Sequence, residues 1–436
     1  MVLLTTWWLA GPMLAPADDW PQWLGPHRDA IWRETGILRQ FPANGPVVLW
    51  RTPISTGYSG PAVAQGRVYV CDRVEGKAAA SGAAVGDASS KERVLCLDEE
   101  NGRVLWQYEY DCVYRLSYPA GPRTTPAVAD NKVYSLGAEA HLYCLEARTG
   151  KMLWSRQLKQ DYQAKTPVWG FASHPLVDGQ KLICVVGGKD SLIVAFDKDT
   201  GKELWRALEA REPGYCPPVI FEAGGRRQLI IFYPEGLASL DPETGKTYWH
   251  QPYFAKTGLT ISTPRKLGDL LFVTSFYNGP MMMRLAADRP AASLAWRGKS
   301  SSEMETDGLH SIISTPFLEG GHIYGVCSYG QLRCLKAETG ERLWETFAAT
   351  TSGTRVRWAN AFLVKNGAVF FLANELGDLI IARLSAQEYQ ELDRAHLLEP
   401  TNRDCGRLVV WSHPAFANRS VIARNDREII RVSLAE

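Results

Sequence analysis

Short stretches of alternating apolar and polar residues run along most of the chain and end repeatedly in one phrase. In this phrase a hydrophobic strand is followed by an acidic or polar turn that ends in Gly, and then by a strand that closes on Trp. Clear copies occupy residues 95–106, 142–154, 193–205, 237–249 and 332–344, and a degenerate copy occupies residues 285–296. The closing tryptophans are 48, 51, 44, 47 and 48 residues apart. A period in the forties built from short strands is typical of a β-propeller or a solenoid.

One repeat can be divided into four strands. In the second repeat we expect strands at residues 127–129, 132–136, 141–146 and 151–156, because each stretch alternates apolar and polar residues and is bounded by a turn. A sheet of this size cannot bury both faces alone, so it must stack on neighbouring sheets. A Trp at a fixed place in each repeat is suited to fill the space between two sheets. The repeats therefore predict blades packed around a common axis.

The number of repeats predicts a closed ring. The first strands of the repeats begin near Pro61, Pro126, Pro175, Pro217, Pro264, Pro316, Ala361 and Pro414. The last copy stops after its third strand, whereas residues 47–52 form an isolated fourth strand that contains Trp50. We therefore predict an all-β, eight-bladed β-propeller in which the N-terminal strand completes the last blade. The predicted docking residues are Trp50, Trp106, Trp154, Trp205, Trp249, Trp296 and Trp344.

Three segments depart from the repeat. Residues 1–17 are apolar and end in Ala15-Pro16-Ala17, which predicts a signal peptide and a periplasmic or extracellular protein, although no Lys or Arg precedes Arg28. This run is too short and too broken by Gly and Pro to predict a membrane span. We expect residues 18–46 to be an N-terminal extension along the surface, and residues 47–436 to form the propeller.

Two further departures lie inside the propeller. The stretch between Asp72 and Val94 is rich in small and polar residues, which predicts a mobile loop in the first blade. In the seventh blade, residues 385–402 replace the turn-and-Trp phrase with Ala, Gln, Glu, Leu and Arg, which favour a short helix.

Charge and cysteine content exclude several kinds of function. The formal net charge is +1, from 48 basic and 47 acidic residues, so nucleic acid is not an expected partner. The nine cysteines include no CxxC motif and no Cys/His spacing suited to zinc. The D-x-D-x-G run from Asp197 to Gly201 is one copy of the repeated turn rather than a calcium loop. The sequence thus predicts no metal site.

The phrase LDxxTGxxLW resembles the tryptophan-docking repeat of PQQ-like, quinoprotein-type propellers, a family with a WD40/YVTN-like fold. This family includes dehydrogenases dependent on pyrroloquinoline quinone (PQQ) and the propeller lipoprotein of the outer-membrane β-barrel assembly machine. The pieces WPQWLGPHRD, GPRTTPAV, VWGFASHPLVDG and WSHPAFANR are similar to a group of exported bacterial propellers. The resemblance implies the fold and export.

An enzymatic role is an alternative that the resemblance raises. The dehydrogenases bind PQQ on Ca²⁺ through a carboxylate and an amide and use a catalytic Asp, and one branch has two adjacent cysteines. This sequence has no adjacent cysteines and no matching Glu/Asn/Asp set. We therefore expect neither PQQ nor Ca²⁺ as a cofactor and assign no catalytic residue.

Polar and aromatic residues cluster in the loops before the innermost strands, which surround the central channel of a propeller. A small ligand could bind there, by stacking and charge, to Arg123, Trp169, His174, Arg357, Trp358 and His413. In the alternative, structural interpretation, which we favour, the Ser, Thr and His residues of these loops only satisfy backbone groups around the channel.

The sequence favours an exported, non-catalytic propeller that acts as a binding or protein-scaffolding module. Its partner would be a protein or small molecule at one face of the propeller. A quinoprotein-like oxidoreductase with a divergent PQQ site is one alternative. A carbohydrate-binding or glycan-processing protein is another.

Overall fold

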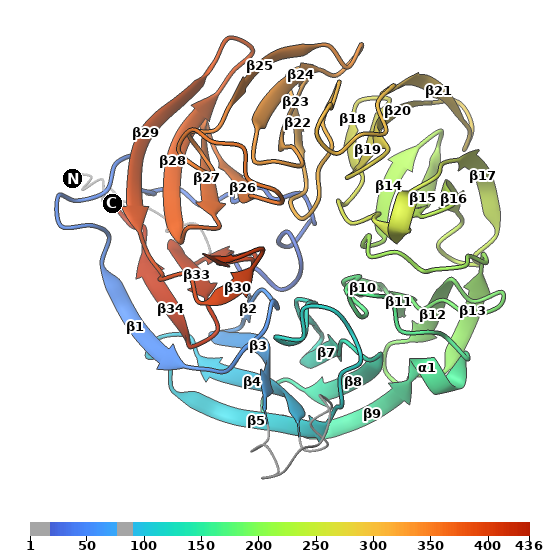
Figure 1. Ribbon diagram of the computed structural model, residues 1–436. Helices are drawn as coiled ribbons and strands as arrows, with labels where there is room; N and C mark the ends of the chain where they lie inside the picture. The colour runs from blue at the N-terminus through green and yellow to red at the C-terminus, as the bar shows by residue number, and fades with distance from the viewer. Residues whose placement is uncertain (1–17, 76–89) are drawn as a thin grey trace, which may run out of the picture.

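The protein is an eight-bladed β-propeller. A computed structural model describes residues 18–75 and 90–436, in which eight four-stranded antiparallel sheets form a ring (Figure 1). The predicted fold class is therefore confirmed. The predicted signal peptide and most of the predicted mobile loop, residues 76–89, lie outside the described residues.

The first four blades follow one another along the chain, each from its innermost to its outermost strand. Blade 1 contains β2 (Ala62–Ala64), β3 (Arg67–Val74), β4 (Lys91–Asp98) and β5 (Val104–Asp111). Blade 2 contains β6 (Ala127–Ala129), β7 (Lys132–Leu136), β8 (His141–Glu146) and β9 (Met152–Gln157). Blade 3 contains β10 (Leu176–Asp178), β11 (Lys181–Val185), β12 (Ile193–Asp197) and β13 (Glu203–Ala207). Blade 4 contains β14 (Val219–Ala223), β15 (Arg226–Tyr233), β16 (Gly236–Leu240) and β17 (Thr247–Pro252).

The remaining blades continue the ring. Blade 5 contains β18 (Arg265–Leu267), β19 (Leu270–Ser275), β20 (Gly279–Leu285) and β21 (Ala292–Arg297). Blade 6 contains β22 (Phe317–Glu319), β23 (His322–Val326), β24 (Leu332–Lys336) and β25 (Arg342–Thr346). Blade 7 contains β26 (Ala361–Asn366), β27 (Val369–Asn374), β28 (Asp378–Leu384) and β29 (Tyr389–His396). Blade 8 contains β32 (Ala415–Ala417), β33 (Ser420–Arg424), β34 (Glu428–Ser433) and, from the other end of the chain, β1 (Val48–Pro53).

Little structure lies outside the blades. A hairpin of β30 (Asn402–Asp404) and β31 (Arg407–Val409) follows blade 7, and the described helices are α1 (Leu158–Asp161) and the 3-10 turn η1 (Lys256–Gly258). Among the described residues, no helix has the length and apolar character needed to cross a membrane.

The N-terminal strand closes the ring, as predicted. β1 pairs antiparallel with β34, with Trp50 opposite Arg431 and Pro53 opposite Glu428. In Figure 1 the blue strand β1 lies beside the red strand β34. β34 pairs with β33 on its inner side, and β1 gives its outer edge a hydrogen-bonded neighbour. Blade 8 therefore has the same four-stranded form as the other blades.

Most of the repeated tryptophans join one blade to the next. The indole N–H of Trp154 donates to the carbonyl oxygen of Lys198 at 3.0 Å, and its ring packs on Gly201 in the turn of the following blade. Trp50, Trp106, Trp296 and Trp344 donate to the equivalent turns of their following blades. Trp249 instead donates to Gln228 of its own blade.

The helix predicted within residues 385–402 is wrong. This stretch forms the outermost strand β29, which pairs with β28 in a register that places Leu384 opposite Tyr389 and Asp378 opposite His396. Its residues favour a helix when isolated, but here the free edge of β28 offers a full ladder of backbone hydrogen bonds. Tertiary pairing therefore overrides local helix propensity.

The N-terminal extension runs along the surface only in part: residues 42–44 are exposed, but its aromatic first half is buried. It crosses one end of the channel, and the side chains of Trp20 and Trp32 are 2% and 1% exposed. Trp20 exchanges two backbone hydrogen bonds with Val63 of blade 1, whereas the Trp32 N–H donates to the Lys365 carbonyl of blade 7. The buried aromatic residues of the extension pack against neighbouring blades. Trp20 contacts Phe416 of blade 8, and Trp32 contacts both Phe416 and Phe371 of blade 7.

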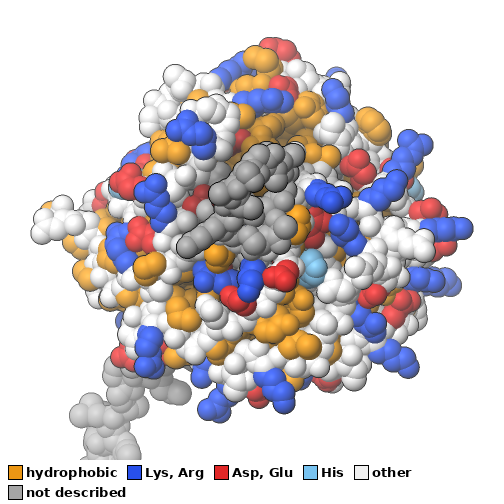
Figure 2. All heavy atoms as spheres, turned by 60° about the horizontal axis from the view of Figure 1, so that its bottom comes forward, with side chains coloured by type: hydrophobic (Ala, Val, Ile, Leu, Met, Phe, Trp, Pro, Cys, Tyr) orange, Lys and Arg blue, Asp and Glu red, His pale blue; other side chains and the backbone are white. Residues whose placement is uncertain are grey.

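One face of the protein is of mixed charge. On the face shown in Figure 2, acidic and basic side chains are interspersed with apolar ones. This distribution agrees with the formal net charge of +1.

Candidate functional site

The loops before the innermost strands are tied together by hydroxyl side chains. Ser59 of blade 1 donates to the Thr124 carbonyl of blade 2 at 2.8 Å, and Ser173 of blade 3 donates to the Cys216 carbonyl of blade 4 at 3.0 Å. Ser412 of blade 8 reaches back to blade 1 in the same way. These hydroxyls satisfy backbone groups around the channel, which is the role that the structural interpretation gives them.

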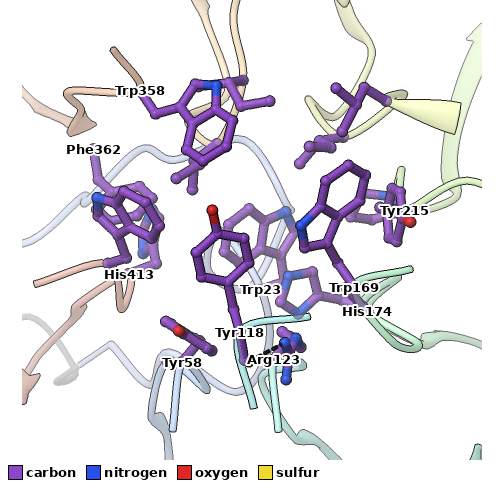
Figure 3. Close-up of a pocket in the computed structure, with 18 residues that line it drawn as sticks. Trp23, Tyr58, Tyr118, Arg123, Trp169, His174, Tyr215, Trp358, Phe362 and His413 are labelled. Carbon is purple, nitrogen blue, oxygen red and sulfur yellow. Dashed lines mark hydrogen bonds between the residues drawn. The ribbon is translucent and has the colours of Figure 1, made fainter. Parts of the chain in front are cut away.

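The same loops also surround a cavity of about 190 Å³. Figure 3 shows side chains from several blades converging on it. Of the six ligand-binding residues predicted from the sequence, Arg123, Trp169, His174, Trp358 and His413 lie in its wall. The other lining residues are Trp23, Tyr58, Gly60, Tyr118, Ala172, Tyr215, Pro217, Leu259, Ile261, Ile312, Ile313, Phe362 and Trp411.

Trp23 and two histidines form an aromatic group in the wall of this cavity. The rings of Trp23 and His174 are parallel within 9° with centroids 4.0 Å apart, and His413 packs against the same indole at 4.8 Å. Nδ1 of His174 accepts the backbone N–H of Thr125 at 2.8 Å. Burial lowers the pKa of both imidazoles, that of His413 to about 4. Both rings are therefore neutral at pH 7 and act as flat, weakly polar surfaces.

Arg123 is the one formally charged residue of the described lining at pH 7. Its guanidinium donates to the carbonyl oxygens of Gly121, Ser117 and Tyr118, and lies over the ring of Tyr58 at 5.1 Å from the centroid. Desolvation lowers the pKa of Arg123, but an arginine stays protonated at neutral pH. No carboxylate within residues 18–75 and 90–436 forms a salt bridge with it. The cavity thus contains a positive charge that no described carboxylate neutralises.

Arg357 does not reach the cavity wall. Its guanidinium lies 2.7 Å from a carboxylate oxygen of Glu303 and 4.6 Å from the ring centroid of Trp358. The ion pair with Glu303 neutralises this side chain, so Arg357 is not available to a ligand as an unpaired charge. The sequence indicated the right loop but could not show that Glu303, in another loop, would pair with its arginine.

Several aromatic lining residues were not predicted. Trp23 belongs to the N-terminal extension that we expected on the surface, and Tyr118 belongs to the long connection after β5. Trp411 directly precedes the second Ser-His-Pro sequence, much as Trp169 lies shortly before the first. That repeated neighbourhood was a signal that could have identified Trp411.

The described lining residues do not fit a calcium-bound PQQ. They offer aromatic surfaces for a flat ring system and one arginine for a carboxylate, but they include no Asp, Glu, Asn or Gln side chain. Ca²⁺ requires six to eight oxygen ligands, mostly from carboxylates, amides and carbonyl groups. Aromatic rings and one arginine are present, whereas side-chain ligands for the metal are missing from the described lining.

The known proteins to which the chain is similar are of two kinds, assembly factors and quinoprotein dehydrogenases. A protein 25% identical over 236 residues is the outer membrane protein assembly factor BamB of Burkholderia pseudomallei, and the match covers 52% of this chain and 56% of that protein. A quinoprotein ethanol dehydrogenase of Pseudomonas aeruginosa is 27% identical over 148 residues, which cover 30% of this chain and 23% of the enzyme. The chain therefore spans about half of the first relative and about a quarter of the second.

Solved structures agree with the fold. The crystal structure of BamB from Moraxella catarrhalis superimposes with a TM-score of 0.56 at 16% identity, covering 88% of this chain and 97% of that one. The family model described as "Outer membrane protein assembly factor BamB" matches residues 90–284 and 235–435, which together are most of the chain. The protein therefore belongs to the PQQ-like propeller family that is represented by BamB.

Proposed function

We propose that the protein is an exported, non-catalytic binding module whose channel cavity takes a small, flat, negatively charged molecule. One observation carries this proposal: Arg123 lies in a cavity walled mainly by aromatic and aliphatic side chains, and no described carboxylate is paired with it. A ligand anion would neutralise this charge, and the ligand ring would stack on the surrounding indoles and imidazoles. The lining offers few hydrogen-bonding groups for sugar hydroxyls, so it does not favour the carbohydrate-binding alternative.

A matched pair of probes tests the charge requirement. We expect 2-naphthoate to bind about 10- to 100-fold more tightly than the neutral 2-naphthamide, because a hydrogen bond to a charged group adds about 1.5–3 kcal/mol. Isothermal titration calorimetry measures both dissociation constants. In Arg123→Gln the preference for the anion should disappear while the melting temperature stays within a few degrees of the wild type.

Arg357→Gln is the matched control for this experiment. It removes the same chemical group from a neighbouring loop, but Glu303 already neutralises that arginine outside the cavity wall. The preference for 2-naphthoate should survive in this variant. The proposal fails if Arg123→Gln keeps the preference, or if the wild type binds neither probe at millimolar concentration.

Quinone-dependent catalysis is not expected. The described lining has no carboxylate or amide side chain to hold a metal beside the quinone or to take a proton from an alcohol. Purified protein supplied with PQQ and Ca²⁺ should therefore not reduce an electron-accepting dye when ethanol or glucose is added. Dye reduction that requires both the protein and PQQ would establish the oxidoreductase alternative instead.

Protein scaffolding is a second candidate, and the family match over residues 90–435 favours it. The named relative assembles outer membrane proteins, and this chain would by analogy present a propeller face to a protein partner. Crosslinking in the native host, followed by identification of the linked proteins, tests this role. Recovery of outer-membrane assembly components with the wild type and equally with Arg123→Gln would show scaffolding that does not depend on the cavity.

A further inference from the structure

A carboxylate, a thiol and an imidazole that do not line the channel cavity meet between blades 1 and 2. Glu92 lies on β4, Cys112 directly follows β5, and His141 begins β8. One potential ligand atom from each residue lies within 4.8 Å of the other two. Cys112 Sγ and His141 Nδ1 are 3.6 Å apart. The three residues are far apart in the sequence and belong to two blades, so their spacing gave no motif.

Backbone contacts fix the positions of Cys112 and Glu92. The Cys112 N–H donates to the Ser90 carbonyl at 2.9 Å, which keeps Cys112 beside the start of β4. Gly137 lies against the carboxylate, since a Cβ atom there would be 2.1 Å from Glu92 Oε2. A larger residue at position 137 would push Glu92 away. The close approach of blade 2 to this carboxylate therefore depends on a glycine.

Glu92 is a buried carboxylate with which none of the described cationic side chains pairs. The residue is 1% exposed, and its side chain accepts hydrogen bonds from the Ala138 N–H at 3.0 Å and from the hydroxyls of Tyr110 and Tyr114. Within residues 18–75 and 90–436, no Lys, Arg or His forms a salt bridge with it. These hydrogen bonds offset part of the cost of burying a carboxylate, and a bound cation would lower that cost further.

We propose that Glu92, Cys112 and His141 bind one Zn²⁺ ion, with a fourth position left for water or another ligand. Oxygen, sulfur and nitrogen donors of this kind are those that zinc takes in proteins, whereas Ca²⁺ and Mg²⁺ prefer oxygen alone. Ligand atoms around a tetrahedral zinc are about 3.3–3.8 Å apart, given the usual bond lengths, and the Cys112–His141 contact already has this separation. His141 is partly exposed, which gives the ion a route from solvent. If zinc binds here, the sequence-based prediction of no metal site is wrong.

Metal titration of the whole protein tests the site. The protein is purified under reducing conditions, stripped with a chelator, and titrated with Co²⁺ and then with Zn²⁺. We expect one equivalent of Co²⁺ to produce a thiolate-to-cobalt charge-transfer band, and one equivalent of Zn²⁺ to abolish it. Zn²⁺ should also raise the melting temperature, because it binds the folded state. Neither result depends on the channel cavity, so this test is independent of the proposed function.

Three variants separate this site from adventitious binding. Cys112→Ser should lose the charge-transfer band, and His141→Gln should weaken zinc binding by at least ~10-fold. Cys405→Ser is the control, because Cys405 is the exposed free cysteine and the other eight are buried. If Cys112→Ser does not fold, His141→Gln still tests the site. His141 is partly exposed, so we expect this variant to fold. The proposal is overturned if the wild type shows no band, if His141→Gln binds zinc as the wild type does, or if Cys405→Ser alone abolishes binding.

Discussion

Removal of residues 1–53 is expected to abolish cooperative folding. The deletion takes away β1, which pairs with β34, and also the buried side chains of Trp20 and Trp32. Loss of one large buried aromatic costs about 3–5 kcal/mol. Two such losses, with an unpaired strand edge in addition, approach or exceed the ~5–15 kcal/mol that stabilises a typical domain. Calorimetry should show no cooperative transition, or the protein should aggregate during purification.

Two shorter deletions divide this effect between its causes. A chain that begins at residue 18 retains all the described structure and should melt like the full chain. A chain that begins at residue 47 retains the β1–β34 pairing but loses the segment that crosses the channel, so its melting temperature should be intermediate. Unchanged melting after removal of residues 1–53 would disprove the closure of the ring by β1.

Trp154→Ala is expected to destabilise the fold by about 3–5 kcal/mol. Trp154 is 8% exposed, and it bridges blades 2 and 3 through its contact with Gly201 and its hydrogen bond to Lys198. Gly201→Ala should also destabilise, because a Cβ there would lie 2.7 Å from the indole and the backbone φ is +70°. Chemical denaturation of the two single variants and the double variant measures the coupling between these residues.

The two causes of the glycine effect can be separated. Gly66 has a φ of +72°, and none of the described atoms lies within 4 Å of the place that a Cβ would take there. Gly66→Ala therefore has the backbone strain alone, about 1–2 kcal/mol. Gly201→Ala should lower the free energy of unfolding by more than Gly66→Ala does, and the difference measures the clash with Trp154. This difference should vanish when Trp154 is already Ala. Strictly additive effects of Trp154→Ala and Gly201→Ala would show that the indole does not dock on this glycine.

The sequence predicted the fold well because each repeat carries the same sequence signals. The turn glycine, the closing Trp and the strand alternation occur together in blade after blade, and the two incomplete ends complement each other. The prediction failed where pairing with a neighbour outweighs local preference. Tyr389–His396 has helix-forming residues, but it follows the free edge of β28 and becomes a strand.

The site was harder to predict because it depends on contacts across the ring. The loops before the innermost strands could be located from the repeat, and five of the six candidate residues do line one cavity. The sequence could not show that Glu303 neutralises Arg357 or that Trp23 enters the cavity wall from the N-terminal extension. It also could not show that Glu92 meets Cys112 and His141, since that depends on the packing of two blades.

The pairing of β1 with β34 also determines when, during synthesis, the ring of blades can close. Arg51 and its salt-bridge partner Glu428 are 377 residues apart, so synthesis at about 5–20 residues per second separates them by roughly 20–80 s. During this interval the first strand is available without its partner, and it carries the exposed apolar side chains of Val48 and Leu49. The nascent chain therefore has an N-terminal strand whose backbone edge is unpaired until β34 has been synthesised. We expect a chaperone that assists this protein to shield that strand edge until β34 is available.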